Sequence, residues 1–265
     1  MTFWEAVFLG ALQGASEFLP VSSSGHLVMG QALLGLDLPG ILFEVVVHVA
    51  TLLSVLVVYR RRLFELGRGA LIERSKTAWR YIGYLVLGTL PVAVIGLAFG
   101  DEIEQLFASP WVVGVALLVT GAILLSSRWA LRRPMDAELG VRIALLIGIS
   151  QCLALTPGIS RSGTTVVVAL WLGVSPVEAA AFSFLLSIPA IGGAAILSFP
   201  DLMDGVEAIG ARPLLGAAIV AAVVGVLAIR TFVAMLRNRS FPAFAGYCAA
   251  VGTAFLVWLG LSGSG

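Results

Sequence analysis

Two polar segments interrupt an otherwise apolar chain, and together they hold the side chains that phosphate chemistry uses. The first, "SEFLPVSSSGH" at 16–26, carries a carboxylate, serine hydroxyls and an imidazole. The second, "TPGISRSGTT" at 156–165, carries a guanidinium among hydroxyls. Guanidinium groups bind phosphate oxygens, while the other groups can attack phosphorus or carry protons. If the two segments meet in space, they form one phosphate-binding site.

Arg161 is the candidate phosphate ligand of the second segment. Its planar fork can bind two phosphate oxygens at once, and Ser160, Ser162 and Thr165 offer hydroxyl contacts beside it. Backbone N–H groups at the start of the following apolar helix would add donors. A charge at membrane depth is costly and usually functional. The alternative is a structural ion pair in which Arg161 only neutralises Glu17.

Gln13 and Glu17 are the candidate cation ligands. They are four residues apart, so they share one face of a helix. Glu17, together with the Gln13 carbonyl, could hold a divalent cation, Mg²⁺ or Ca²⁺. Such a hard cation needs only one or two protein carboxylates when it shares phosphate oxygens. The alternative is a polar packing contact between helices.

Three serines and one of the two histidines are candidates for attack, phosphate contact and proton transfer. We expect Ser23 to be the nucleophile, with Ser22 and Ser24 as phosphate or cation contacts. Another serine or an activated water is the alternative nucleophile. His26 follows "SSSG" and could relay a proton to or from the attacking hydroxyl or the leaving oxygen. His48, in "VVVHVATLL", lacks polar neighbours and is interpreted as structural.

The composition predicts an all-α polytopic membrane protein with a single membrane domain over residues 1–265. Hydrophobic residues make up 59% of the chain and charged residues 12%, against roughly 25% charged in soluble domains. A helix needs about 20 apolar residues to span the hydrocarbon core. Six stretches are long enough: 41–59, 80–99, 111–130, 178–198, 213–235 and 243–262.

The polar segments are each flanked by apolar pieces that are too short to span. These pieces run near 3–16, 26–35, 141–155 and 164–172. Each pair is expected to form a re-entrant helical hairpin, in which Pro20 and Pro157 end a helix and Gly25 and Gly163 allow tight turns. Irregular backbone at membrane depth is tolerated only when it is buried in protein or lines a wet cavity.

The charge distribution predicts the orientation of the spans. All but two basic residues cluster near 60–80, 128–142 and 230–239, whereas the loops near 101–104 and 201–207 are acidic. By the positive-inside rule, the basic loops are cytoplasmic and the acidic loops are external, so both termini are external. Of the two remaining basic residues, Arg212 falls in an external loop, and only Arg161 lies at membrane depth.

The two halves of the chain, approximately 1–130 and 139–265, resemble each other. A shift of 138 positions superimposes Gly10 on Gly148, Gln13 on Gln151, Ser22 on Ser160, Ser24 on Ser162, and Gly25 on Gly163. Each half is one hairpin followed by three spans. Because three is odd, the second half is inserted upside down, so the hairpin tips can meet near the midplane.

Several motifs follow one another along the chain in a recognisable order. The pattern [E/Q]-x-x-x-E occurs as "QGASE" at 13–17, followed by "FLPVSSSGH" at 18–26. The pattern P-G-x-S-R-S-x-x-T occurs as "PGISRSGTT" at 157–165, and "SFLLSIPA" follows at 183–190. By these motifs, the chain resembles the undecaprenyl-diphosphate phosphatase family associated with bacitracin resistance, over essentially its whole length.

The resemblance implies an activity and a location. It implies hydrolysis of undecaprenyl diphosphate to undecaprenyl phosphate with a divalent cation, and carrier-lipid recycling for peptidoglycan synthesis. It also implies a bacterial plasma membrane protein whose site opens to the periplasm or exterior. The matching motif residues are Glu17, Ser23, His26, Ser160, Arg161 and Thr165. The family pattern allows Gln13 at its first position, which weakens any requirement for two carboxylates.

A transporter or flippase of a phosphorylated lipid or anion is the alternative from another functional class. Inverted repeats around a broken-helix site are typical of secondary transporters. The Ser–His–Glu set favours an enzyme, because simple anion binding does not need it. The expected partners are a polyprenyl diphosphate substrate and membrane lipid, without nucleic acid; the sequence leaves the oligomeric state open.

Overall fold

The structure is a computed structural model that describes residues 1–36, 42–198 and 209–262. Over these residues, every regular element is a helix. This agrees with the predicted all-α class. The helices are α1 (Phe3–Phe18), α2 (Ser23–Leu34), α3 (Leu42–Val58), α4 (Arg60–Leu71), α5 (Lys76–Ala98), α6 (Gly100–Phe107), α7 (Pro110–Ala130), α8 (Val141–Leu153), α9 (Arg161–Trp171), α10 (Pro176–Leu197), α12 (Ala211–Arg237) and α13 (Ala243–Ser262).

Five of the described helices are long and apolar enough to cross a membrane: α5, α7, α10, α12 and α13. The helices α3 and α4 pass the same test only as a pair, and a bend of 75° separates them. The five long helices overlap five of the six stretches that the sequence predicts as spans, whereas the stretch 41–59 corresponds to α3 alone. Large apolar side chains such as Leu90 and Val94 on α5 are exposed, as lipid-facing residues are. The chain is therefore a multi-pass membrane protein.

Two segments expected as loops contain helices. The basic segment after residue 59 forms α4, because its leucines recur at helical spacing: Leu63 and Leu66 pack on the core while Arg60 and Arg61 are exposed. The acidic segment after residue 99 contains the short helix α6. The second acidic loop, with its charges near 201–207, lies outside the described residues.

The two hairpins lie where the sequence predicts them, but α2 and α9 each begin three residues earlier than expected, inside the polar segments. The helices α1 and α2 are joined through 19–22, and α8 and α9 through 154–160. Pro20 and Pro157 lie in these connections, as predicted, since proline cannot continue a helix there.

The prediction that Gly25 and Gly163 form the turns is wrong, because both lie in the first turn of a helix. Left-handed backbone occurs instead at Ser22, with φ 69°, and at Gly158, with φ 99°. Close packing explains the two helical glycines. A Cβ on Gly25 would lie 3.0 Å from the Gly158 Cα. A Cβ on Gly163 would lie 3.1 Å from the Pro20 Cβ.

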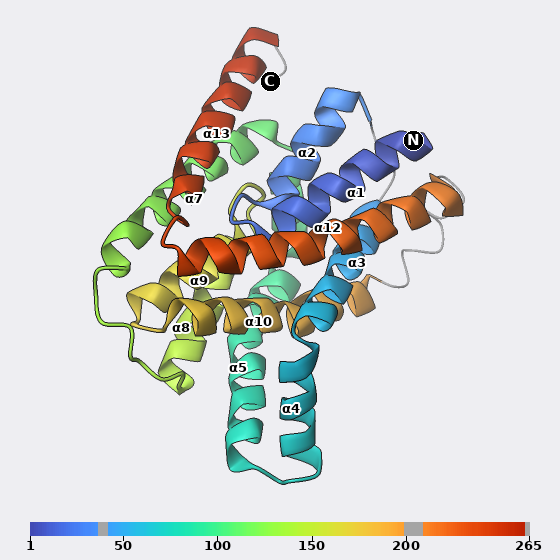
Figure 1. The fold of residues 1–265 in the computed structure, drawn as a ribbon. Coiled ribbons are helices and arrows are strands. Elements are labelled where there is room, and N and C mark those ends of the chain that lie inside the picture. Colours follow the sequence, from blue (N-terminus) through green and yellow to red (C-terminus); the bar gives the residue numbers. More distant parts are fainter. Residues whose placement is uncertain (37–41, 199–208, 263–265) are drawn as a thin grey trace.

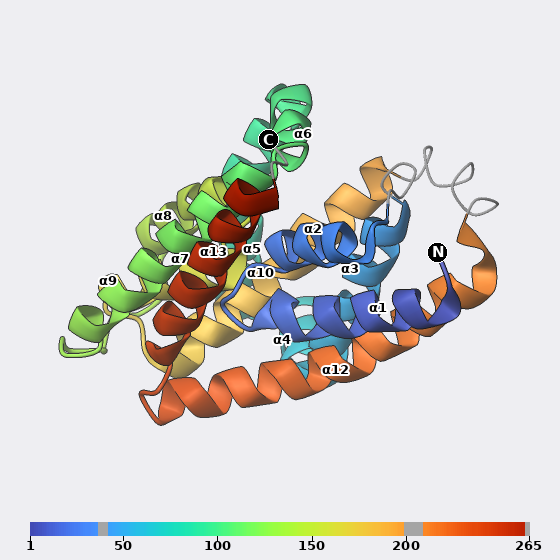
Figure 2. The ribbon, with the colours of Figure 1, turned by 90° about the horizontal axis from the view of Figure 1, so that it is seen from above.

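The first helix of each hairpin packs on a span from the other half of the chain. The helix α1 lies along α12 (Figures 1 and 2), and α8 lies against α5. Gly10 and Gly14 on α1 face Ala217 and Ala221 on α12, and a Cβ on Gly14 would lie 2.5 Å from the Ala221 carbonyl oxygen. Small residues at four-residue spacing let two backbones approach this closely.

An aromatic cluster fixes the end of α1 that carries Glu17. Phe18 is fully buried and meets the Phe184 ring of α10 edge to face, with centroids 5.5 Å apart. Phe184 in turn contacts Phe232 of α12 at 5.1 Å. Such pairs contribute about 0.5–1.5 kcal/mol beyond their buried area. The carboxylate of Glu17 is thus held by a rigid element.

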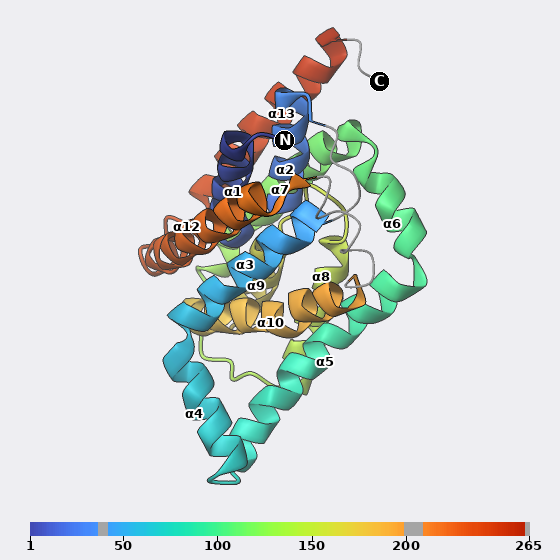
Figure 3. The same cartoon turned by 90° about the vertical axis from the view of Figure 1, so that its right-hand side faces the viewer.

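Different helices form the two ends of the molecule (Figures 1 and 3). The helices α4 and α5 project as an antiparallel pair, and their turn lies opposite the start of α1 and the end of α13 (Figures 1 and 3). Arg74 lies in that turn, and Arg68 and Lys76 lie in the adjoining ends of α4 and α5.

Candidate active site

The tips of the two hairpins are in direct contact. Ser22 Oγ, from the first tip, accepts a hydrogen bond from the backbone N–H of Gly158 in the second, at 3.1 Å. Ser162 Oγ, from the second tip, donates to the Leu19 carbonyl in the first, at 3.4 Å. Segments almost 140 residues apart in sequence therefore form one polar site.

Each tip is built around a serine that caps the following helix. Ser22 Oγ accepts from the Gly25 N–H at 3.3 Å, and Ser160 Oγ accepts from the Gly163 N–H at 3.1 Å. Capping serines satisfy donors that the first turn of a helix leaves free. The first residue of α2 is therefore Ser23, and the first residue of α9 is Arg161.

Glu17 is the centre of the polar contacts. Its carboxylate accepts from Arg161 Nη2 at 2.7 Å, from Ser23 Oγ at 2.5 Å and from Gln13 Nε2 at 3.0 Å. His48 Nε2 lies 3.5 Å from Glu17 Oε2. The expectation that Gln13 and Glu17 share a helix face is confirmed. Glu17 is only 7% exposed, so a cation, an imidazole and a hydroxyl surround a carboxylate that is shielded from solvent.

The Arg161 guanidinium bonds protein acceptors through only some of its N–H groups. Besides Glu17, its guanidinium donates to the Ser183 carbonyl at 3.2 Å. Thr165 Oγ1 bonds the Arg161 carbonyl at 2.7 Å and the Ser183 hydroxyl at 2.6 Å, which ties α9 to α10. The remaining guanidinium N–H groups have no hydrogen-bond partner among the described residues. They are free to bind an anion.

The expectation that His48 lacks polar neighbours is wrong, whereas its interpretation as a structural residue stays a prediction. Its Nδ1 lies 2.7 Å from the Glu44 carbonyl, which can only accept, so Nδ1 carries a proton. The other ring nitrogen, Nε2, faces the Glu17 carboxylate. A histidine within an apolar span was itself a signal for function, although nothing in the sequence pointed to Glu17.

His26 makes its hydrogen bonds away from Ser23. Its Nδ1 lies 2.8 Å from the Ser22 carbonyl and its Nε2 lies 2.8 Å from the Tyr247 hydroxyl. The Tyr247 ring also stacks on the imidazole, with centroids 5.7 Å apart. The role of His26 as a proton relay stays a prediction. Tyr247, on α13, has no signal in the sequence that links it to His26.

The hydroxyls of the two tips differ in exposure. Those of Ser22, Ser160, Ser162 and Thr165 belong to residues that are at most 3% exposed. Ser23 and Ser24 are only half-buried. Phosphate contact by the buried hydroxyls therefore stays a prediction, while Ser23 and Ser24 are the tip serines that a ligand can reach without displacing packing.

The fold and the site together define a helical multi-pass membrane protein with a buried carboxylate, an arginine and a serine at the meeting point of two hairpins. The family model described as bacitracin resistance protein BacA matches residues 6–254. The chain belongs to this family.

Curated relatives cover nearly the whole chain. The undecaprenyl-diphosphatase of Elusimicrobium minutum is 40% identical over 97% of this chain and 98% of its own length. That of Rubrobacter xylanophilus is 43% identical over 92% and 93%. That of Korarchaeum cryptofilum is 39% identical over 97% and 99%.

Proposed function

We propose that this chain is a membrane phosphatase that hydrolyses undecaprenyl diphosphate to undecaprenyl phosphate and inorganic phosphate. The observation that carries the proposal is the contact of Glu17 with both Ser23 and Arg161, which places a hydroxyl, its proton acceptor and an anion-binding group together. The names of the relatives support the substrate. The product is the carrier lipid that cell-wall synthesis reuses.

Ser23 is the nucleophile in this proposal. As its hydroxyl passes a proton to Glu17, Oγ bonds the terminal phosphorus and the bond from that phosphorus to the bridging oxygen breaks. Undecaprenyl phosphate leaves with the bridging oxygen. Water then hydrolyses the phosphoserine, its oxygen bonds phosphorus, and a proton returns to Ser23 Oγ. The 2.5 Å contact with Glu17 makes this transfer direct.

Arg161 binds the transferred phosphoryl group. Its free N–H groups stabilise the charge that spreads over the phosphoryl oxygens, in a site where low dielectric strengthens the interaction. The N-termini of α2 and α9 add a favourable field for an anion. Ser24 adds a hydroxyl contact, and Ser22, Ser160, Ser162 and Thr165 hold the tips in place or contact phosphate oxygens after rearrangement.

Each histidine has a distinct role. His26 relays a proton to the leaving oxygen, which requires its Nε2 to exchange the Tyr247 hydroxyl for a substrate oxygen. His48 positions the Glu17 carboxylate through the 3.5 Å contact of its Nε2.

A divalent cation, Mg²⁺ or Ca²⁺, is the cofactor that fits these residues. Glu17 supplies a carboxylate, and Gln13 Oε1 is a buried acceptor without a hydrogen-bond partner in the described part of the chain. Within the same ranges, no three His, Cys, Asp or Glu side chains cluster for a metal. Glu17 and Gln13 would hold the cation with substrate oxygens completing its shell. When bound, the cation neutralises diphosphate charge.

The architecture that we propose is six spans and two re-entrant hairpins in an inverted repeat. The two tips support the repeat because they match: Ser22 Oγ and Ser24 Oγ are 3.3 Å apart, and the corresponding Ser160 Oγ and Ser162 Oγ are also 3.3 Å apart. The first helix of each hairpin also packs on the second span of the other half. The site then opens to the periplasm or exterior of a bacterial plasma membrane, with the polyprenyl tail between spans.

A phosphate-release assay tests the proposal. Purified protein in detergent receives a polyprenyl diphosphate with radioactive terminal phosphate, and acid-quenched samples are analysed for free phosphate and for label on Ser23. Ser23→Ala should abolish both, whereas Ser24→Ala should retain labelling. Turnover by Ser23→Ala would assign the attack to water. Absence of phosphate release by the wild-type protein would instead favour the transporter or flippase alternative.

A further inference from the structure

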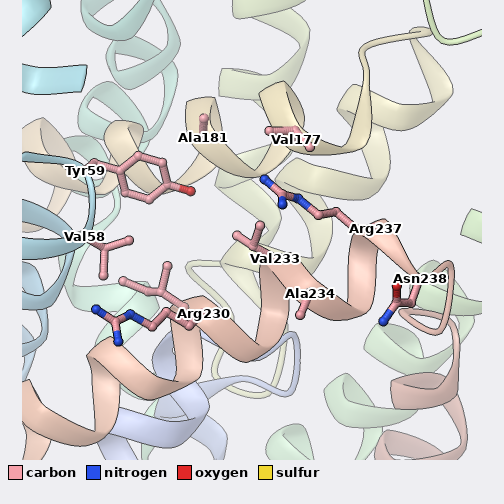
Figure 4. A pocket seen from close by; sticks show the side chains of 10 residues that line it. Val58, Tyr59, Val177, Ala181, Arg230, Val233, Ala234, Arg237 and Asn238 are labelled. Carbon is pink, nitrogen blue, oxygen red and sulfur yellow. The ribbon is translucent and has the colours of Figure 1, made fainter. Parts of the chain in front are cut away.

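A cavity separate from the Glu17 site lies between α12, α10 and the junction of α3 with α4. It measures about 420 Å³, within the range of roughly 300–1,000 Å³ for small-molecule sites. Figure 4 shows Arg230 and Arg237 of α12 at this cavity, together with Tyr59. Among the described residues, none of these three forms a hydrogen bond or an ion pair with Glu17, Ser23 or Arg161.

The two guanidinium groups and the Tyr59 hydroxyl at this cavity have no hydrogen-bond or ion-pair partner in the described part of the chain. Both arginines are exposed, so within the described ranges their guanidinium groups face the cavity and its surroundings and not a carboxylate. In Figure 4 the Tyr59 hydroxyl points toward the Arg237 guanidinium. The carboxylate of Glu178, beside the cavity, is already paired with Arg62 at 3.4 Å. The two arginines therefore leave positive charge uncompensated.

Apart from Asn238, the remaining wall of the cavity is apolar. It is formed by aliphatic side chains from three helices: Val58, Val177, Ala181, Ile229 and Val233. An apolar wall next to two unpaired cations matches a ligand with an anionic head and a hydrocarbon chain. In a chain that crosses the membrane, the surrounding bilayer supplies such amphiphiles.

We propose that this cavity binds an anionic glycerophospholipid. Its phosphate lies between Arg230 and Arg237, and an acyl chain covers the aliphatic wall. Basic pockets between membrane helices bind the headgroups of anionic lipids. Bulk lipid is also present at high concentration, so even a weak site is filled. The proposal is independent of the phosphatase function, because it uses none of the residues around Glu17.

Lipid binding by the full-length protein tests the proposal. In neutral detergent micelles, phosphatidylglycerol with a fluorescent acyl chain is titrated with protein, and anisotropy gives Kd. Arg230→Gln combined with Arg237→Gln should raise Kd roughly 25-fold, about fivefold for each arginine. The matched control is Arg61→Gln with Arg128→Gln, which removes two exposed charges outside the cavity. The control pair should leave Kd nearly unchanged.

A steric variant separates the cavity from general surface charge. Val177→Trp retains both arginines and fills the cavity, and the Val177 side chain is 46% exposed, so the core is not disturbed. It should weaken binding roughly as much as loss of one arginine, while phosphate release stays normal. Equal losses in the two arginine pairs, or undiminished binding by Val177→Trp, would overturn the proposal. Displacement by undecaprenyl phosphate at lower concentrations than by phosphatidylglycerol would reassign the cavity to the product.

Discussion

Arg161 Nη2 and Glu17 Oε1 lie 2.7 Å apart, although 144 positions separate the two residues in sequence. The side chains are 16% and 5% exposed. Removing one partner of a buried ion pair leaves an uncompensated charge, which costs about 3–5 kcal/mol. This contact joins the two hairpins, and it leaves other N–H groups of the Arg161 guanidinium for the phosphate of a diphosphate substrate.

Arg161→Lys should lower activity although it retains the charge. A flexible ammonium cannot reproduce the planar fork that reaches both Glu17 and a phosphate. Loss of one charge-assisted hydrogen bond costs about 1.5–3 kcal/mol, or roughly 10- to 150-fold in kcat/KM. The measurement is phosphate release by a variant with a wild-type melting temperature. Near-normal turnover would reduce Arg161 to a partner that only neutralises Glu17.

Glu17→Gln and His26→Ala should fail in different ways. If Glu17 holds the cation, the Gln variant needs more Mg²⁺ or Ca²⁺ for half-maximal activity, and its rate also falls because a proton acceptor for Ser23 is lost. If His26 only carries a proton, His26→Ala keeps the cation requirement and loses roughly 10²- to 10⁴-fold in rate. Titration of each variant with both cations distinguishes these outcomes. A shifted cation requirement in the His26 variant alone would reverse the assignments.

His48→Ala should act through Glu17. We expect lower phosphate release, and a smaller effect of the same substitution when Glu17→Gln is already present, because the contact of the two side chains is then altered. A double-mutant cycle on kcat/KM should give a coupling of about 0.5–3 kcal/mol. Val49→Ala, on the same helix and exposed, is the matched control. Additive losses would mean that His48 supports the fold and not the carboxylate.

Gly14→Ala should destabilise the protein by about 1–3 kcal/mol, because the added methyl group forces α1 away from Ala221. The control is Gly83→Ala on α5, where a Cβ would meet nothing within 4 Å. Alanine is favoured over glycine in helices by about 1 kcal/mol, so the control should retain or gain stability. Thermal unfolding in detergent compares the two variants. Equal melting temperatures would contradict close packing of α1 on α12.

The proposed orientation predicts which side of the membrane reaches two engineered cysteines. In a background without Cys152 and Cys248, the free cysteines of the described chain, Glu104→Cys should react with an impermeant thiol reagent on intact cells. Ile72→Cys, which is exposed in the α4–α5 turn region, should react only after the cells are opened. The opposite labelling pattern would invert the topology.

The apolar lengths and the two prolines predicted the helices and the hairpin connections, because those features depend on local sequence. The spacing of Gln13 and Glu17 likewise predicted a shared face. The contact of His48 with Glu17 depends on how α3 is rotated against α1, which periodicity does not define. Tyr247 meets His26 through the packing of α13, and Gly25 serves a close approach between tips. Such contacts follow from tertiary packing and leave no pattern along the chain.

The packing of α1 on α12 has a consequence for biosynthesis. Gly10 leaves the ribosome before its partner Ala217 and before most of the spans that lie between them in sequence. The first hairpin, with its carboxylate and serines, therefore enters the membrane long before the surface that holds it exists. Its polar tip has to be sheltered by water, lipid headgroups or insertion machinery in the meantime. The site is complete only after the second half, which carries Arg161, has been inserted. A chain whose synthesis stops before that point lacks Arg161, so we expect it to be inactive toward the cell's lipids.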